Sequence, residues 1–300
     1  MVIFGEKYDF TEFEIQRLRG RFNAILHVDE MGELRRTISH TNVSLIVLNL
    51  DDAVSGSIVR YLSDLSVEYG IEFLTFEHFM EKYLFKCYIP KGCTQLHWLD
   101  DLKPYTKWQY FQKRCIDFFG VFWLFFFSWP VMLTCKKKIK EQSLGPIFYK
   151  QMRIGYANRE FECIKFRSMR LDAEKDGARF ASKDDDRIFP WGKVMRRTRF
   201  DELPQMLNIL KGEMHLIGPR PERLVYTRQF CAEIPYYNER HLVAPGITGW
   251  AQVMYPYGES AEDARQKLMY DLYYIKHWSI WREFQIVYLT AKTVINKKGV

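Results

Sequence analysis

One uncharged run of apolar and aromatic residues constrains the fold of this chain more than any other feature. It covers residues 118–135 and is 18 residues long. As an α-helix, this run is about 27 Å long, which is just enough for a hydrocarbon core of about 30 Å. The run therefore predicts a membrane helix, and hydropathy alone fits a plain single span.

Two features favour a re-entrant helix that enters and leaves the bilayer on one side. Lysines and arginines, which prefer the cytoplasmic side of a membrane, flank both ends of the run. They are Lys113, Arg114, Lys136, Lys137, Lys138 and Lys140. Pro130 removes one backbone hydrogen bond, and the Ser128 hydroxyl can bond a freed carbonyl, so a bend is expected there. We expect a re-entrant membrane helix over residues 111–140.

Charge divides the chain into two parts. Residues 1–109 carry 12 Lys and Arg against 16 Asp and Glu, whereas residues 110–300 carry 32 against 21. An acidic part joined to a basic part indicates two units with different partners, and the basic unit suits phosphates or lipid headgroups. No helix-turn-helix, zinc-finger or RNA-binding pattern accompanies the charge, so nucleic acid is not an expected partner.

The cysteines and the N-terminus indicate the compartment. The six cysteines form no Cys-x-x-Cys pair and have no histidines at metal-ligand spacing, which is typical of free thiols in a reducing compartment. No spacing suggests a metal site at His215, His241 or His277 either, so surface or turn positions are expected for them. No secretory signal is expected at the N-terminus. Both units are therefore expected on the cytoplasmic side.

Residues 1–88 alternate between strand-like and helix-like patterns. Strands are predicted at 2–4, 24–27, 44–49 and 72–76, and helices at 10–18, 31–39 and 58–69. This alternation predicts a small α/β domain with a parallel, doubly wound sheet. Only Gly5 follows the first strand, so the fold is a degenerate Rossmann-like one without the dinucleotide fingerprint. A regulatory, structural or oligomeric role is expected. Prolines and glycine then predict a linker at 89–110.

The most informative motif of the basic unit is the carboxylate pair Asp201 and Glu202. Leucines at helical spacing follow, and Gly212 supplies a stop, so a short helix is expected to begin near Asp201. Backbone amides and the helix dipole would then keep Asp201 ionised and attract phosphate. An ordinary helix cap explains the pair equally well. Nearby arginines favour phosphate chemistry, and two prolines restrict the backbone around Arg220, which aims its guanidinium at a fixed anion.

Ordered blocks follow residue 112. They are Gly145-Pro-Ile-Phe-Tyr-Lys-Gln151 with Arg153 and Gly155, Lys165-Phe-Arg-Ser-Met169, Asp201-Glu-Leu-Pro-Gln205, Leu210-Lys-Gly-Glu213, Gly218-Pro-Arg-Pro221, Pro245-Gly-Ile-Thr-Gly-Trp-Ala-Gln252 and Tyr270-Asp-Leu-Tyr-Tyr-Ile-Lys276. Together they resemble the bacterial sugar transferases, which are monotopic polyprenyl-phosphate phosphoglycosyl transferases. Residues 255–274 look most like the exopolysaccharide-priming branch.

The resemblance implies a reaction and its participants. A sugar 1-phosphate passes from a UDP-sugar to undecaprenyl (polyprenyl) phosphate and UMP is released, as the priming step of exopolysaccharide or other surface glycan synthesis. Asp201 attacks the phosphorus that bears the sugar and becomes a phosphosugar-aspartate, and Glu202 holds Mg²⁺ against the diphosphate. The enzyme is expected at the bacterial inner membrane, in contact with membrane lipid, and homo-oligomers are possible. The alternative is a catalytically silent scaffold of a polysaccharide assembly machine.

The resemblance also assigns roles to further residues. Arg196 and Arg220 are expected phosphate contacts. Lys165 and Arg167 are further candidates, which a solvated basic strand edge explains as well. Pro130 matches the proline that breaks the family's re-entrant helix, although the family has serine directly before it and here Ser128 lies one place further back.

Residues 141–300 are expected to form the catalytic domain, which is mainly α-helical (α+β). Aromatic and basic residues mix over 270–293, which suits amphipathic helices in the headgroup layer, while packing against the domain core is an equal alternative. The transferred sugar does not follow from the sequence, because donor choice depends on the shape of the pocket.

Overall fold

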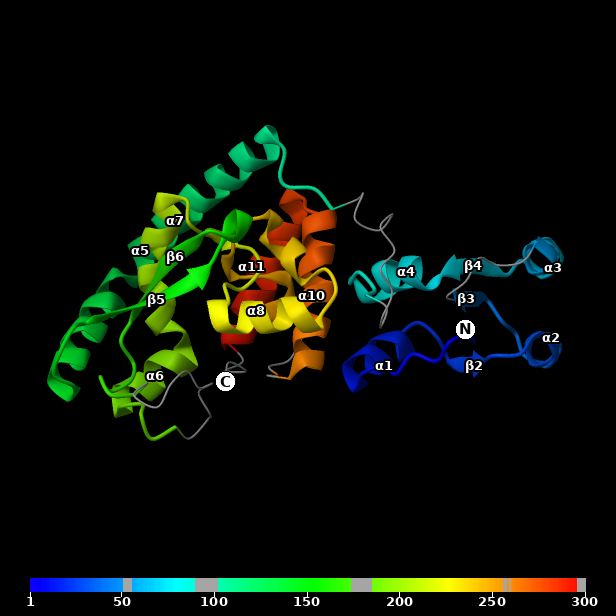
Figure 1. The fold of residues 1–300 in the computed structure, drawn as a ribbon, viewed down its shortest axis with the longest axis horizontal. Helices are drawn as coiled ribbons and strands as arrows, with labels where there is room; N and C mark the ends of the chain where they lie inside the picture. The colour runs from blue at the N-terminus through cyan, green and yellow to red at the C-terminus, as the bar shows by residue number, and fades with distance from the viewer. Residues whose placement is uncertain (51–55, 90–101, 174–184, 256–257, 259, 296–300) are drawn as a thin grey trace. The chain divides into compact units, whose positions relative to one another are not determined.

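The computed structural model describes residues 1–50, 56–89, 102–173, 185–255, 258 and 260–295 (Figure 1). The chain separates into two compact units, Met1–Tyr88 and Ile89–Val300. Most of the linker predicted at 89–110 falls on residues 90–101 and so lies outside the described residues.

The N-terminal unit is a four-stranded parallel sheet in the order β2-β1-β3-β4. The predicted small parallel sheet and the helices between its strands are confirmed. The elements are β1 (Val2–Gly5), α1 (Glu12–Arg19), β2 (Leu26–Val28), α2 (Met31–His40), β3 (Leu45–Asn49), α3 (Gly56–Tyr69), β4 (Glu72–Thr75), α4 (Phe76–Phe79) and the π-helix η1 (Met80–Leu84).

Two apolar clusters cover the two faces of this sheet. Neighbouring residues of a strand point to opposite faces, so Ile3 and Phe4 of β1 belong to different clusters. Ile3 packs with Leu18 of α1 and with α4 and η1. Phe4 packs with Leu34 of α2 and Leu62 of α3. The sheet therefore has helices on both faces, as a doubly wound fold requires.

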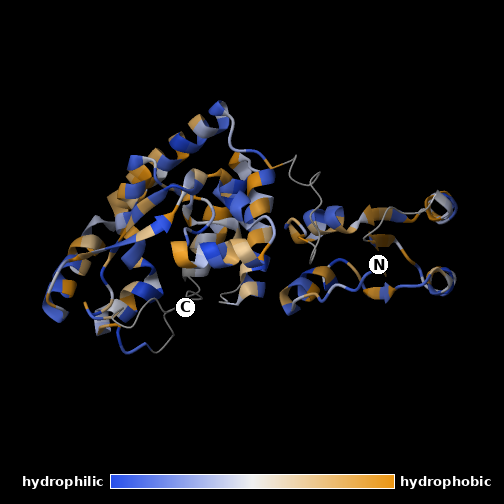
Figure 2. Cartoon of the chain, viewed as in Figure 1, coloured by the Kyte–Doolittle hydropathy of each residue, from blue (hydrophilic) through white to orange (hydrophobic). Residues whose placement is uncertain are grey.

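The second unit contains one long helix, α5 (Lys107–Gln142). Thr106 begins it with a capping box, because its hydroxyl accepts from the Gln109 amide and the Gln109 side chain accepts from the Thr106 amide. With 36 residues it is about 54 Å long. Among the described residues it alone is long and apolar enough to cross a membrane, and Figure 2 shows both of its ends as hydrophilic.

The point predicted to bend is helical throughout. Helix α5 continues through Pro130. The expected bond from Ser128 is wrong, because its buried hydroxyl has no partner among the described residues. The carbonyl of Pro130 instead accepts from the Thr134 hydroxyl at 3.0 Å. The continuous helix does not show the chain turning back, so the re-entrant path stays a prediction.

The rest of this unit is mostly helical, as expected. Strands β5 (Phe148–Ile154) and β6 (Glu160–Phe166) form an antiparallel pair, and β7 (His215–Ile217) and β8 (Gly246–Thr248) form a parallel pair. The helical elements are η3 (Tyr156–Asn158), α6 (Pro190–Thr198), η4 (Phe200–Gln205), α7 (Met206–Lys211), α8 (Leu224–Glu233), η5 (Tyr237–Leu242), α9 (Trp250–Met254), α10 (Ala261–Lys276) and α11 (Ile280–Ile295).

The prediction of amphipathic helices in the headgroup layer has a different outcome for each of the last two helices. Helix α10 is a core helix, since every residue from Leu268 to Ile275 is buried. Core packing, the alternative kept open for this segment, is therefore correct for α10. Helix α11 instead exposes Trp281, Phe284 and Tyr288. A place in the headgroup layer stays a prediction for α11 alone.

Candidate active site

The carboxylate pair lies on η4, a 3₁₀ turn between α6 and α7. Arg199 adopts a left-handed conformation (φ 61°) that turns the chain out of α6. As predicted, a helical segment begins near Asp201 with Pro204 in its first turn, but it begins as the 3₁₀ turn η4, and the α-helix α7 starts only at Met206. The expected N-cap role of Asp201 is wrong, because Arg199 holds the N-cap position of η4 and no side chain caps this turn.

One oxygen of Glu202 accepts from two cations. Its Oε1 lies 2.9 Å from Nζ of Lys165 on β6 and 3.1 Å from a guanidinium nitrogen of Arg220. Arg199 lies 4.0 Å from the same oxygen. Burial alone would raise the pKa of Glu202, but these cations hold that pKa well below its usual range. Glu202 is therefore ionised.

Asp201 has the opposite electrostatic character. It is buried, and its Oδ1 has no hydrogen-bond partner among the described residues. Burial, and then the charge of Glu202, raise the pKa of Asp201, while Lys165 and Arg196 oppose the rise. The expected lowering of this pKa by a helix start is not seen, since desolvation outweighs the favourable charges. A buried acceptor without a partner suits a site where a ligand completes the bonding.

Of the four residues predicted to contact phosphate, three lie near the carboxylate pair and one does not. Lys165 and Arg220 reach Glu202, and Arg196 lies in the last turn of α6, where its charge acts on Asp201. Arg167 is buried elsewhere, with its guanidinium donating to Ser143 and Pro146 at the end of α5. The physical reason is that β6 ends at Phe166, so Arg167 no longer shares the face of Lys165.

A small pocket lies beside this pair and includes residues that sequence reasoning did not assign to the site. Its lining residues are Arg153, Cys163, Lys165, Gln205, Arg220, Pro221 and Gly246. Cys163 and Lys165 are two positions apart on β6, so strand alternation places them on one face. That alternation is the signal that could have identified Cys163. The lining carries three cations, but the volume of about 10 Å³ gives room for about one water molecule.

The carboxylates of the site fit Mg²⁺ if a bound diphosphate supplies further oxygen ligands. No group of three or more His, Cys, Asp or Glu side chains that could hold a metal occurs in the described parts of the chain. Mg²⁺ is commonly held by one or two carboxylates together with substrate phosphates. The ionised Glu202 and the Asp201 oxygen, which bonds to none of the described residues, supply this kind of ligand. The residues therefore fit a magnesium ion that a bound diphosphate helps to hold.

Buried charges near the start of α5 also escaped sequence analysis. Nδ1 of His215 lies 2.6 Å from Asp117, and Nζ of Lys113 lies 2.5 Å from Glu283. His215 and His241 are both buried, so the expected surface positions are wrong, although His241 does lie on the 3₁₀ turn η5. His215 lies on strand β7, which packs against α5. Lys113, counted above as a flanking membrane charge, is buried inside the unit.

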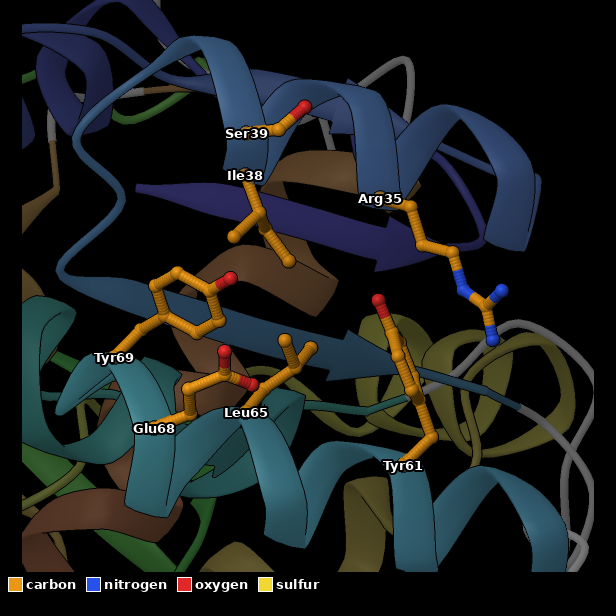
Figure 3. Close-up of a pocket in the computed structure, with 7 residues that line it drawn as sticks. All are labelled: Arg35, Ile38, Ser39, Tyr61, Leu65, Glu68 and Tyr69. Atoms are coloured by element: carbon orange, nitrogen blue, oxygen red, sulfur yellow. The ribbon is translucent and has the colours of Figure 1, made fainter.

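A second hollow lies in the N-terminal unit, where side chains of α2 and α3 point into the gap between the two helices (Figure 3). Its volume is about 400 Å³, and it is lined by Arg35, Ile38, Ser39, Tyr61, Leu65, Glu68 and Tyr69. Small-molecule sites have similar volumes, of about 300–1,000 Å³. The guanidinium of Arg35 lies 4.4 Å from the centre of the Tyr61 ring, in a cation–π contact.

Known proteins resemble the second unit. Residues 108–297 match the family of bacterial sugar transferases. A UDP-N-acetylgalactosamine-undecaprenyl-phosphate N-acetylgalactosaminephosphotransferase of Aeromonas hydrophila is 48% identical over 57% of this chain and 40% of its own length. A UDP-glucose:undecaprenyl-phosphate glucose-1-phosphate transferase of Xanthomonas campestris pv. campestris is 43% identical over 57% and 36%. One of the same description from Caulobacter vibrioides is 36% identical over 61% and 70%.

The share of each protein that these matches cover differs between the relatives and the family. The chain spans about two fifths of the length of the first two relatives. The family match, in contrast, covers more than half of this chain, including α5, both carboxylates and the Pro-Arg-Pro turn. The chain belongs to the bacterial sugar transferase family.

Proposed function

We propose that this chain transfers a sugar 1-phosphate from a UDP-sugar to polyprenyl phosphate, such as undecaprenyl phosphate, and releases UMP. The observation that supports this proposal most directly is the different bonding of the two adjacent carboxylates. Glu202 is ionised between two cations, whereas the neighbouring Asp201 has a buried oxygen for which the described part of the chain supplies no partner. The printed functions of the relatives support the same reaction class.

In the first step, an ionised carboxylate oxygen of Asp201 attacks the phosphorus that bears the sugar. The bond from this phosphorus to the bridging oxygen breaks, and UMP leaves with that electron pair. Lys165 and Arg220 neutralise charge on the diphosphate from the side of Glu202. Mg²⁺ held by Glu202 would add Lewis-acid stabilisation of the same oxygens.

In the second step, a phosphate oxygen of the polyprenyl phosphate attacks the same phosphorus. The bond between phosphorus and the Asp201 oxygen breaks, which regenerates the carboxylate and yields a polyprenyl diphosphate sugar. Two anionic phosphates need not be held at once, because UMP leaves before the lipid phosphate attacks. This sequence explains the use of a covalent intermediate.

A lipid acceptor requires a site at a membrane, and the exposed aromatic residues support this. Helix α5 exposes large apolar side chains over its middle, which soluble surfaces rarely do. They are Phe118, Phe119, Phe122, Trp123, Phe125, Phe126, Phe127, Trp129 and Leu133. We propose that α5 is embedded in the bacterial inner membrane, that α11 lies in the headgroup layer and that both units face the cytoplasm.

The test uses the full chain in lipid nanodiscs with undecaprenyl phosphate. UMP release is measured for UDP-glucose, UDP-galactose and UDP-N-acetylgalactosamine, with Mg²⁺ and with EDTA. At least one donor should release UMP only with Mg²⁺. Without acceptor, about one UMP per enzyme should appear, and mass spectrometry should find the added sugar phosphate on Asp201. The silent-scaffold alternative predicts no release with any donor, and turnover without a labelled Asp201 would exclude the covalent step.

A further inference from the structure

The Pro-Arg-Pro turn that carries Arg220 is held through its carbonyl oxygens. Pro219 and Pro221 have no amide hydrogen, so the turn has few donors of its own. Four consecutive carbonyls, from Pro219 to Glu222, each accept a hydrogen bond from another part of the chain. The donors are the amide of Gly246 (2.9 Å), the Arg240 guanidinium (2.9 Å), the Arg153 guanidinium (3.1 Å) and the amide of Ile154 (3.0 Å).

Arg240 is the donor that reaches Arg220 itself, and it is anchored on its other side. Its NH2 group lies 2.9 Å from the carbonyl of Arg220 and also 2.9 Å from a carboxylate oxygen of Asp271 on α10. Its NH1 group donates to the Tyr237 hydroxyl at 2.6 Å. Arg240, Asp271 and Tyr237 are all buried. The guanidinium therefore links the core helix to the backbone of the turn.

Stability alone gives a weak reason for this buried ion pair. Removing two charges from water is expensive, and apolar pairs of similar volume are often as stable or more stable. The planar fork of an arginine, however, fixes the direction of several bonds at once. This fork holds the backbone of Arg220, whose side chain lies 3.1 Å from Glu202. The pair thus supplies geometry at the carboxylate site.

We propose that Arg240, held by Asp271 and Tyr237, is a positioning residue that sets the direction in which Arg220 approaches Glu202 and the donor diphosphate. The inference rests on the proposed function, because it adds a residue to the same site. Arg153 also bonds the turn, but it is in direct contact with the small pocket, which it lines. Arg240 has no such contact, which makes it the cleaner residue to test.

The test is a double-mutant cycle on UMP release. Arg240→Gln should lower kcat/KM about 10- to 100-fold in the native background, since a displacement of about 1 Å can cost that much. In an Arg220→Ala background the same change should cost less than about threefold, because the group that it positions is gone. A merely structural role would give equal factors in both backgrounds, and that result would overturn the proposal.

Two further variants guard against a simple loss of folding. Arg240→Met combined with Asp271→Leu removes both buried charges and should keep the fold while showing the same coupling to Arg220. Arg265 provides a matched control, since it too is buried and donates to a backbone carbonyl (Ile89, 2.8 Å) and to a carboxylate (Glu262). Arg265→Gln should leave kcat/KM within about twofold of the parent when rates are normalised to folded protein.

The outcomes separate this inference from the function on which it rests. An inactive parent chain would reject the proposed function and the positioning role with it. An active parent with a large loss in Arg220→Ala but equal Arg240→Gln factors in both backgrounds would leave the function intact and reject the positioning role. A loss in Arg265→Gln as large as that in Arg240→Gln would likewise assign both arginines to folding.

Discussion

Two buried charge clusters in the second unit use the same residue types in different ways. At the base of α5, Lys113 bonds Glu283, whose other oxygen accepts from the Tyr274 hydroxyl and the Trp278 ring nitrogen. Both oxygens of Glu283 are therefore satisfied. At the carboxylate site, two cations share one oxygen of Glu202.

The remaining difference lies in the neighbouring carboxylates. Asp117, close to the first cluster, has both oxygens bonded, to His215 and to the Leu216 amide. Asp201 has a buried oxygen with no partner among the described residues. We call the cluster of Lys113, Glu283 and Asp117 closed, because the carboxylate oxygens in it are all bonded, and the cluster around Asp201 and Glu202 open. A closed cluster holds helices together, whereas an open cluster can still bond a ligand. The comparison predicts that changes in the open cluster alter activity and changes in the closed cluster alter stability.

The largest expected effect is on activity, in Asp201→Asn. Loss of a nucleophile should reduce UMP release about 10⁴-fold or more. The melting temperature should stay equal or rise, because the fold disfavours the charged form of this side chain. The exposed Asp186→Asn is the control and should change neither quantity. Near-normal turnover in Asp201→Asn would exclude the proposed nucleophile.

The next effect is on stability, in Lys113→Met. Breaking a buried ion pair leaves Glu283 charged and unpaired, so the free energy of unfolding should fall by about 3–5 kcal/mol. Denaturant unfolding in detergent measures this change. Lys113→Met combined with Glu283→Gln should recover most of the loss. If the single variant were stable but inactive, the closed cluster would belong to the site and the comparison would fail.

A smaller effect is expected from pH. Asp201 must be ionised to attack, and its pKa is raised above the usual value of about 4. The rate of the first step should therefore fall about tenfold per unit as pH drops below that raised pKa. Glu202 stays ionised over this range because its pKa is lowered. The burst of UMP without acceptor isolates this step, and a flat profile between pH 4 and 7 would contradict the raised pKa.

The two units also differ in how far the sequence predicted them. In the N-terminal unit the strand and helix patterns are local, and all four predicted strands and three predicted helices appear. The carboxylate pair was visible because its residues are adjacent. Its cations were harder to assign, since Lys165 is 37 positions from Glu202. The closed cluster joins Lys113 to residues 161 and 170 positions away, which no local pattern reveals.

The smallest expected effect concerns Ser128, whose hydroxyl is buried and without a partner among the described residues, as is the Asp201 oxygen. No ion pair or hydrogen bond with a cation is found for Ser128 among the described residues, so we do not expect a ligand site there. Ser128→Ala should change UMP release by less than about twofold. Pro130→Ala should restore a backbone donor in α5 and straighten any bend there.

Cysteine labelling measures the different effects expected of Ser128→Ala and Pro130→Ala on the path of α5. Single cysteines in place of Gln112 and Lys140, in a cysteine-free background, should react with an impermeant reagent from the same side if α5 is re-entrant. Ser128→Ala should keep this pattern, whereas Pro130→Ala should move one of the two cysteines to the opposite side. A changed pattern in Ser128→Ala would give its hydroxyl a role in the path of the helix. A buried polar atom without a partner would then indicate a functional residue even where no cation lies close by. Nearby charge alone would in that case not distinguish functional residues from structural ones.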